Sequence, residues 1–209
     1  STDDTVKNIL TNQKYINLLV SEKDDGIYHA MNKALKFVNG QVIVFINAGD
    51  IFVKNGLSTI HKKFKKNPDA DFIFGTVRRH YVESTILKYG FNRQRLKYNF
   101  DFATSHSTGF FIKKKSMNLI GNYNTTFKCS ADYDLYYRAL IKFNLKGNST
   151  KRNELIGIFK SGGFSSKIGF FTQLFEETKI RLHNKQNIFF VGLIFFNAII
   201  KHFLKTFIK

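Results

Sequence analysis

The sequence predicts an α/β protein in which a mostly parallel sheet is flanked by helices. First, an amphipathic helical pattern over residues 27–38 is followed at once by the unbroken apolar run VIVFI at residues 42–46. Second, that run stops in the small, polar turn NAGD at residues 47–50. Third, strand-like and helix-like segments alternate along the chain, which is typical of parallel strands joined by helical crossovers.

Residues 21–52 form the stretch around which the other segments are arranged. Apolar residues recur three and four positions apart until Asn39 and Gly40 end the helical pattern. The β-branched and aromatic run over residues 41–46 is typical of a strand buried on both faces of a parallel sheet. The predicted inward face of the helix consists of Ile27, Met31, Ala34, Leu35 and Val38.

The flanking segments supply further elements of both kinds. Residues 1–5 read as a turn leading into a helix, and residues 15–20, YINLLV, read as a short buried strand. A helix is expected over residues 55–66, with a lysine-rich outer face that we interpret as solvated surface instead of a binding patch. Its predicted inward residues are Leu57, Ile60 and Phe64.

The middle of the chain continues the alternation. Residues 71–77, DFIFGTV, predict the next strand, and residues 81–89 predict a strand that pairs nearby after a turn. Residues 93–98 form a basic, aromatic-containing loop or short helix.

Residues 108–112, TGFFI, return as a strand, and residues 115–120 form a helical turn closed by Gly121. Residues 132–143 are strongly amphipathic and predict a helix, and residues 154–159 predict the last strand. The inward residues of that helix are predicted to be Leu135, Ala139 and Leu140.

The C-terminal segment, residues 167–209, differs from the rest and is expected to be a helical tail. Residues 188–200, IFFVGLIFFNAII, are almost wholly apolar and have basic residues on both sides. This run is shorter than the roughly 20 residues that span a hydrocarbon core. An interfacial helix held to anionic headgroups by its cationic flanks is therefore predicted. The alternative is an ordinary core or dimer helix.

The composition limits the possible partners. Among 209 residues, 33 Lys and Arg outnumber 15 Asp and Glu, which gives a formal net charge of +18. This excess attracts polyanions, but a compositional bias of the coding sequence explains it equally well. Lys, Phe and Tyr are spread along the chain and form no recognised stacking motif, so nucleic acid is not an expected partner. Cys129 is the only cysteine, which excludes an intrachain disulfide and favours a reducing, cytoplasmic compartment.

Acidic residues stand at two places where α/β proteins bind ligands. Asp50 follows a predicted buried strand, where a carboxylate can hold a divalent cation that bridges phosphate oxygens, and Gly49 lets a ligand approach the backbone. On spacing alone, a turn Asp that caps the following segment is the simpler interpretation of Asp50. Asp132 and Asp134 begin a predicted helix, so one can cap it while the other stays ionised as a general base.

Several blocks of the sequence together resemble the family 2 glycosyltransferases of bacterial surface-polysaccharide assembly. The resemblance covers residues 1–166 and implies the Rossmann-like GT-A fold. It also implies that this domain is N-terminally incomplete, because the strand, helix and strand that open the family's domain are absent from the sequence. The matching blocks are STDDT at 1–5, SEKDDGIYHAMNKALKFVNGQVIVFINAGDIF at 21–52, TGFFIKKKSMNLIG at 108–121 after His106, and SADYDLYYRAL at 130–140.

The resemblance implies roles for single residues. Asp132 matches the catalytic base of the family's ED motif, with Ala131 in place of the Glu, and Asp134 is then structural. Asp50 matches the last acid of the metal-binding DxD-type turn, with Ala48 where many members have another Asp. Residues matched to the donor side or the turn beside it are Asp24, Gly26, Asn32, Asn47 and His106.

Other matched positions leave alternatives open. His106 contacts the donor or acceptor in one interpretation and is a packed loop histidine in the other. Met31 stands where relatives often carry an Arg that contacts phosphate. Gly162 and Gly163 match a mobile loop that closes over the site.

The implied activity is inverting transfer of a sugar from a nucleotide-sugar donor, with UDP as the expected nucleotide and Mn²⁺ or Mg²⁺ as cofactor. The acceptor is a hydroxyl of a saccharide or a lipid-linked molecule in capsule, O-antigen or exopolysaccharide assembly. The expected location is the cytoplasmic face of the inner membrane. The alternative is a catalytically inactive remnant that acts as a membrane-bound partner or scaffold, which the missing start, Met31 and Ala48 favour.

Overall fold

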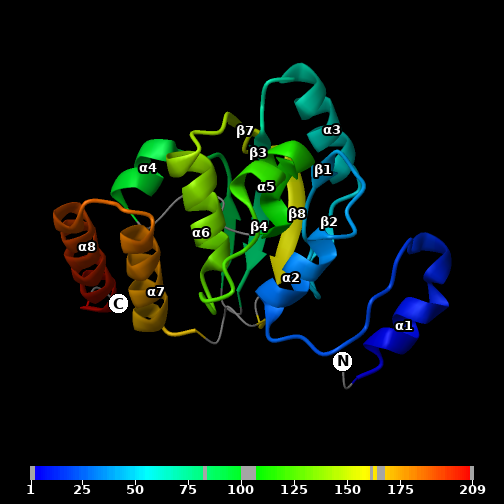
Figure 1. Ribbon diagram of the computed structural model, residues 1–209, viewed down its shortest axis with the longest axis horizontal. Helices are drawn as coiled ribbons and strands as arrows, with labels where there is room; N and C mark the ends of the chain where they lie inside the picture. Colours follow the sequence, from blue (N-terminus) through cyan, green and yellow to red (C-terminus); the bar gives the residue numbers. More distant parts are fainter. Residues whose placement is uncertain (1–2, 82–83, 100–106, 161, 164–167, 208–209) are drawn as a thin grey trace.

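The computed structural model describes residues 3–81, 84–99, 107–160, 162–163 and 168–207. Its strands form two four-stranded sheets at the centre of the molecule (Figure 1). The strands are β1 (Val42–Ile43), β2 (Ile51–Phe52), β3 (Phe72–Phe74), β4 (Thr76–His80), β5 (Thr85–Lys88), β6 (Phe110–Lys113), β7 (Gly147–Ser149) and β8 (Leu155–Lys160).

Helices surround the sheets and confirm the α/β class (Figure 1). Within the described residues, a short 3-10 helix over Gln13–Tyr15, another over Ser107–Gly109 and a π-helical turn over Arg138–Lys142 complete the helical segments. The α-helices are α1 (Thr5–Thr11), α2 (Ile27–Leu35), α3 (Gly56–Lys66), α4 (Arg93–Tyr98), α5 (Lys114–Ile120), α6 (Ala131–Tyr137), α7 (Phe170–His183) and α8 (Ile188–Phe207).

The pairing of the strands is mixed, which corrects the expectation of a mostly parallel sheet. One sheet has the order β1-β6-β3-β7 and the other has the order β2-β8-β4-β5. Among the described pairs, β3–β7 and β4–β8 are parallel, whereas β1–β6, β3–β6, β2–β8 and β4–β5 are antiparallel. Alternation of helices and strands predicted the class correctly but could not fix the direction of each strand.

A bend at Gly75 divides the strand predicted over residues 71–77 between the two sheets. The Gly75 N–H donates to the carbonyl of Gly109 over 2.7 Å, and a Cβ atom at this position would lie 2.9 Å from the side chain of Ile156. Residues on either side pair with different neighbours, β3 with β6 and β7, and β4 with β5 and β8. Gly75 therefore lets one chain segment contribute to both sheets.

The strand predicted over residues 41–46 is shorter and less buried than expected. β1 covers two residues and lies at a sheet edge, paired with β6. Ile43 is buried, but Ile46 is 46% exposed. Within the described residues β1 pairs only with β6, and antiparallel, so the predicted place inside a parallel sheet is wrong. The run still packs on both faces, with Ile43 and Phe45 in the larger hydrophobic cluster and Val42 and Val44 against the smaller one.

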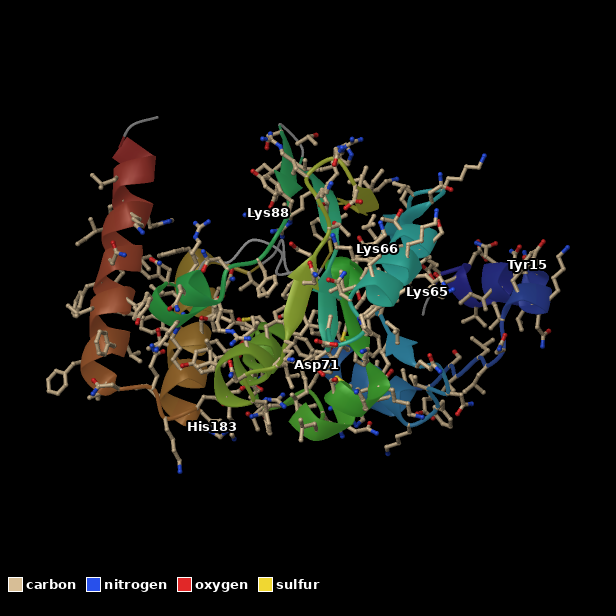
Figure 2. All side chains as sticks on the ribbon, turned by 90° about the horizontal axis from the view of Figure 1, so that it is seen from above. Tyr15, Lys65, Lys66, Asp71, Lys88 and His183 are labelled. Carbon is tan, nitrogen blue, oxygen red and sulfur yellow. The ribbon has the colours of Figure 1, made fainter. Side chains whose placement is uncertain are left out.

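The strand predicted over residues 15–20 does not form. The chain makes the 3-10 turn Gln13–Tyr15 and then continues without regular structure, with Leu18 55% and Val20 49% exposed. Together with α1, this segment forms an arm that projects from the sheets, and Tyr15 lies near its far end (Figures 1 and 2). No described strand lies beside residues 15–20 to complete their backbone hydrogen bonds.

The predicted helices mostly form, with corrections to their inward faces. α2 ends at Leu35 and buries Met31 as expected, but it also buries Tyr28, while Ile27 is 40% exposed and Ala34 is exposed. α3 buries Ile60, whereas Leu57 is 52% exposed. The loop-or-helix alternative for residues 93–98 resolves as the helix α4.

The largest cluster of buried residues lies between the sheet β1-β6-β3-β7 and helices α2, α5 and α6. It contains Phe72, Phe74 and Phe110, whose rings contact one another, and Phe74 and Phe110 also contact Tyr136 of α6. Leu135, Ala139 and Leu140 are buried as predicted. The alternate residues Ile73 and Phe111 face a smaller cluster that includes Ile60 of α3. Helices thus cover both faces of β3 and β6.

The C-terminal tail folds as two helices that lie side by side, with α8 on the outside (Figures 1 and 2). Asn187 directly precedes α8 and caps its first turn, because its side-chain Oδ1 accepts the Phe189 N–H over 2.9 Å. Val191 and Ile194 are buried, whereas the outward face of the helix is apolar and exposed. Within the described residues, no helix combines the length and apolar character required to cross a membrane.

Candidate active site

Asp132 lies at the start of α6, where donors from α2 and from α6 itself reach its carboxylate. Its Oδ1 accepts the Tyr28 hydroxyl over 3.2 Å and the Tyr133 N–H over 2.9 Å. Tyr28 also donates to the carbonyl of Cys129 over 3.0 Å, so it joins α2 to the loop before α6. Burial of the carboxyl group raises the pKa of Asp132 to about 6.

The loop before α6 is held by a carboxylate from the tail. Glu176 of α7 accepts the backbone N–H groups of Lys128 and Cys129, each over 2.7 Å, and the Cys129 thiol over 2.8 Å. Burial alone would raise the pKa of Glu176, but these hydrogen bonds outweigh it and leave the pKa lowered. Burial, with the hydrogen bond to Glu176, raises the pKa of Cys129 to about 12. The position of Asp132 therefore depends on a residue more than 40 positions further along the chain.

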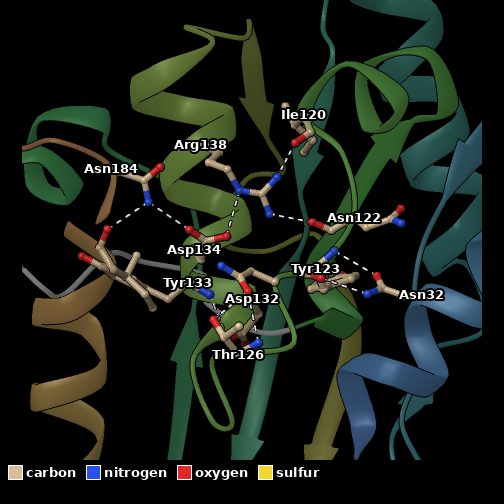
Figure 3. A network of polar contacts seen from close by, with 12 residues as sticks. Asn32, Ile120, Asn122, Tyr123, Thr126, Asp132, Tyr133, Asp134, Arg138 and Asn184 are labelled. Carbon is tan, nitrogen blue, oxygen red and sulfur yellow. Dashed lines mark hydrogen bonds and ion pairs between the residues drawn. The ribbon is translucent and has the colours of Figure 1, made fainter. Parts of the chain in front are cut away.

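Asp134 lies in a buried network of polar contacts, which fits the structural role that the resemblance implies. It is 1% exposed, and it accepts from Arg138 Nε over 2.8 Å and from Asn184 Nδ2 over 2.9 Å (Figure 3). Arg138 in turn donates to the carbonyls of Ile120 and Asn122 (Figure 3). This network joins α6 to the end of α5 and to the segment after α7.

Asn32 uses its side-chain amide to hold the loop between α5 and α6. Its Nδ2 donates to the Tyr123 carbonyl over 2.8 Å, and its Oδ1 accepts the Tyr123 N–H over 2.9 Å (Figure 3). Tyr123 stacks on Tyr28, with 5.6 Å between ring centroids. The structure therefore places Asn32 beside the Asp132 region and gives its amide a structural partner.

Asp50 lies in the turn after β1, packed against the segment before β6. It is 8% exposed, and its Oδ2 accepts the Thr108 hydroxyl over 2.5 Å. In the same turn, Asn47 donates from its amide to Ser107 Oγ over 3.0 Å, and its carbonyl accepts the Asp50 N–H over 3.0 Å. Burial raises the pKa of Asp50.

Arg79 of β4 is a cation of this region that the sequence analysis did not select. Its guanidinium lies 5.0 Å from the ring centroid of Phe159 and 5.6 Å from that of Tyr81. Its positive charge lowers the pKa of both Asp50 and Asp132, against the larger upward effect of burial. The charge of Arg79 therefore acts on the predicted metal ligand and on the predicted base.

The remaining predicted site residues are not all brought together. Asp24 forms an ion pair with Lys33 of α2 over 2.8 Å, and Gly26 begins that helix with φ 113°. Gly162 also has a positive φ, 115°, and Gly163 follows it on the exposed surface. His106 lies outside the described residues.

The donor set for a metal ion is small. Within the described part of the chain, no group of three or more His, Cys, Asp or Glu side chains is arranged to hold a metal ion. Mg²⁺ is commonly held by one or two carboxylates together with substrate phosphates. Asp50 therefore fits a cation that a diphosphate helps to hold, but it does not fit one held by the described side chains alone.

The fold defines the class of the protein. The structure is similar to that of S. aureus TarS residues 1–349 in complex with UDP-GlcNAc, with a TM-score of 0.68 and 15% identity, covering 97% of this chain and 61% of that one. A second TarS structure matches with a TM-score of 0.66 and 13% identity, covering 87% of this chain and 32% of the other. The GT-A fold is thus confirmed.

The sequence identifies the family. Residues 1–141 match the family described as glycosyl transferase family 2, so the chain belongs to this family. Similar relatives are the PGL/p-HBAD biosynthesis glycosyltransferases of Mycobacterium bovis and Mycobacterium tuberculosis, each 25% identical over 144 residues, which is 66% of this chain. The chain spans about half the length of these relatives, since the match covers 54% of them.

Tyr28 and Glu176 support the Asp132 region but were not predicted from the sequence. A sequence pattern could have indicated Tyr28 but not Glu176. Tyr28 and Asn32 are four residues apart, so they share a helix face, and both bond to the segment that carries Asp132. No local pattern indicated Glu176, because its partners are backbone N–H groups in a distant loop.

Proposed function

We propose that the chain is the GT-A domain of an inverting glycosyltransferase in which Asp132 is the catalytic base. The observation that carries this proposal is the position of Asp132 at the start of α6, with Tyr28 donating to it and with a pKa of about 6. An ideal general base has a pKa near the working pH and remains mostly ionised there. An ordinary Asp, with a pKa of 3.8, would be a weaker base.

In the proposed reaction, Asp132 takes the proton from an acceptor hydroxyl as that oxygen attacks the anomeric carbon of the donor sugar. The bond to the nucleoside diphosphate breaks on the opposite face, so the configuration inverts and no covalent enzyme intermediate forms. The Tyr28 hydroxyl holds the orientation of the carboxylate while it waits for the proton. The half-buried setting of Asp132 keeps its basicity high.

We assign the donor diphosphate to the side of the site that carries Asp50. A divalent cation, Mn²⁺ or Mg²⁺, held by Asp50 and by donor phosphates, would neutralise charge on the leaving diphosphate. Thr108 fixes one carboxylate oxygen of Asp50, and Asn47 closes the turn around it. The roles of Asp24, Gly26 and His106 in donor binding are predictions. Closure of a loop at Gly162 and Gly163 over the site is a further prediction.

Titration calorimetry with UDP and GDP, with and without Mn²⁺, tests the donor site without knowledge of the sugar. We expect binding of one nucleotide that requires the metal and is lost in Asp50→Ala. Asp132→Asn should retain this binding and lose transfer to acceptor. A folded chain that binds neither nucleotide contradicts the transferase proposal and favours the inactive remnant that serves as a scaffold.

The tail supports a proposal for the acceptor class. We propose that α8 lies on an anionic membrane surface and brings the site to a saccharide carried on a lipid, as capsule, O-antigen or exopolysaccharide assembly requires. One face of α8 packs on α7 through Phe175 and Phe195, whose ring centroids are 5.7 Å apart. The other face exposes Ile188, Phe189, Phe190, Leu193, Phe196, Ile200, Phe203 and Leu204, each at least 48% accessible.

This surface suits a bilayer because a row of large apolar side chains accompanies the basic Lys201 and the net charge of +18. Such helices insert their apolar face at the headgroup boundary and bind more tightly to anionic lipid. The variant Phe189→Ser/Phe196→Ser should therefore lose co-sedimentation with vesicles that contain anionic phospholipid. The control Leu57→Ser/Leu119→Ser removes two apolar residues elsewhere that are also more than half exposed, at 52% and 58%, and should still bind. Equal binding by all three proteins contradicts the membrane role.

A further inference from the structure

The pairing of three strands places Asp50 and Arg79 on one face of a sheet. In the antiparallel pair β2–β8, Ile51 faces Ile158, and continuing this register by one residue beyond β2 sets Asp50 opposite Phe159. In the parallel pair β4–β8, Arg79 also faces Phe159. Paired residues on adjacent strands project to the same face of a sheet. Asp50, directly before β2, therefore lies in register with Phe159 of β8 and Arg79 of β4, whose strands are spaced about 4.8 Å apart.

The guanidinium of Arg79 is fixed by aromatic rings. It lies over the rings of Phe159 and Tyr81, at 5.0 and 5.6 Å from their centroids. Its Nε is buried and has no hydrogen-bond partner, and no carboxylate of the described residues forms an ion pair with it. A buried donor without a partner costs free energy, and a bound anion would remove that cost.

The surroundings of Arg79 select the kind of anion. The strand register sets Arg79 on the same face as Asp50, so an anion bound by its guanidinium would lie on the side of the site that carries Asp50. The planar guanidinium presents several N–H groups in one fork, which matches the oxygens of a phosphate group. Stacking on the aromatic rings limits its rotamers, so less entropy is lost when the phosphate binds.

We propose that Arg79 forms the centre of a phosphate-binding subsite on the face of the sheet that carries Asp50. This inference deepens the proposed function and rests on it for the identity of the phosphate, which belongs to the diphosphate of the donor or to a phosphate group of the acceptor. The subsite itself requires only an anion whose oxygens are arranged tetrahedrally around phosphorus.

The test uses the whole chain and inorganic pyrophosphate without metal, measured by titration calorimetry. Loss of a charge-assisted hydrogen bond predicts that Arg79→Gln weakens pyrophosphate binding about tenfold or more. Arg79→Lys keeps the positive charge but lacks the forked N–H groups of the guanidinium. Its affinity for pyrophosphate should lie between those of the unmodified chain and Arg79→Gln. Thermal melting of each variant establishes that it is folded.

Arg78 provides the matched control because it is the next residue on β4 and points to the opposite face, where it is exposed. Arg78→Gln removes the same charge from the molecule and should change the affinity less than about twofold. Equal affinity in Arg79→Gln and the unmodified chain overturns the proposal. So does an equal loss in Arg78→Gln and Arg79→Gln, because it would reflect the overall positive charge.

Two further titrations distinguish the sources of the phosphate. If UDP added with Mn²⁺ displaces pyrophosphate and Arg79→Gln weakens UDP binding to the same extent, the subsite holds the donor diphosphate. If pyrophosphate still binds through Arg79 when UDP and Mn²⁺ are saturating, the subsite holds an acceptor phosphate. Arg79-dependent pyrophosphate binding in a chain that transfers no sugar would support the subsite and contradict the transferase proposal, so the two failures are distinguishable.

Discussion

Replacing Asp132 by Asn is expected to stabilise the fold while it abolishes transfer. Burial raises the pKa of this carboxyl from 3.8 to about 6. The folded state therefore holds the proton more tightly than the unfolded state does, and the ionised carboxylate costs stability. Asn mimics the protonated form, and its oxygen can still accept from Tyr28 and the Tyr133 N–H.

The size of the effect follows from linkage between protonation and folding. A rise of about two pKa units corresponds to a cost of at most about 3 kcal/mol at neutral pH. The cost is fully present above the folded pKa of about 6 and disappears as the pH falls below 3.8, where both states are protonated. Between about pH 5 and about pH 8, the advantage of Asp132→Asn should grow by about 1 kcal/mol.

Urea unfolding of both proteins at these two pH values measures the advantage directly. Asp134→Asn is the matched control on the same helix, and we expect it to lose stability because it breaks the ion pair with Arg138. The reasoning is refuted if Asp132→Asn is no more stable than the unmodified chain at the higher pH. It is also refuted if the difference between them does not change with pH.

Three other substitutions test the packing that supports the site. Asn32→Ala should cost about 1–3 kcal/mol in urea unfolding, because both backbone groups of Tyr123 lose their partner. Arg181→Met should lower the free energy of unfolding by about 3 kcal/mol or more and lower the melting temperature with it. The substitution removes a fully buried guanidinium that donates to three backbone carbonyls at the end of α4. Gly147→Ala should cost about 1–3 kcal/mol in the same assay, because its Cβ would lie 2.1 Å from the ring of Phe72.

Much of the fold was predictable from local patterns, because periodicity and turn residues act within a few positions. The helix over residues 55–66 and the strand over residues 154–159 formed within a residue or two of their predicted bounds. Gly121 ends α5 with φ 81°, as a helix-terminating glycine does. Residues 15–20 and 41–46 show the limit, since an apolar run expresses a preference for burial but does not specify the neighbour that buries it.

The site was predictable only in part, for a related reason. Asp50 and Asp132 were located from their places after a strand and before a helix, and the structural role of Asp134 followed from the resemblance. The groups that hold these acids in place come from distant segments. Thr108 contacts Asp50 from 58 positions away, and Tyr28 contacts Asp132 from 104 positions away. Such pairs depend on tertiary packing, which no local pattern contains.

The role proposed for Arg79 depends on the register of one strand pair. Alternation along β4 places Arg78 and Arg79 on opposite faces, but it does not say which face carries the acids. The pairing of β4 with β8 shifts between Thr76 and Val77, since Thr76 faces Leu155 whereas Val77 faces Gly157.

Ile156 is therefore the extra residue, and without it the regular register would place Arg79 opposite Ile158 instead of Phe159. The fold holds this extra residue firmly. Ile156 is fully buried, and its carbonyl accepts the Val53 N–H over 3.0 Å. Gly56 and Gly75 leave room for it, since a Cβ atom at either position would lie within 3.0 Å of Ile156. The packing around one core residue thus determines that Arg79 shares a face with Asp50.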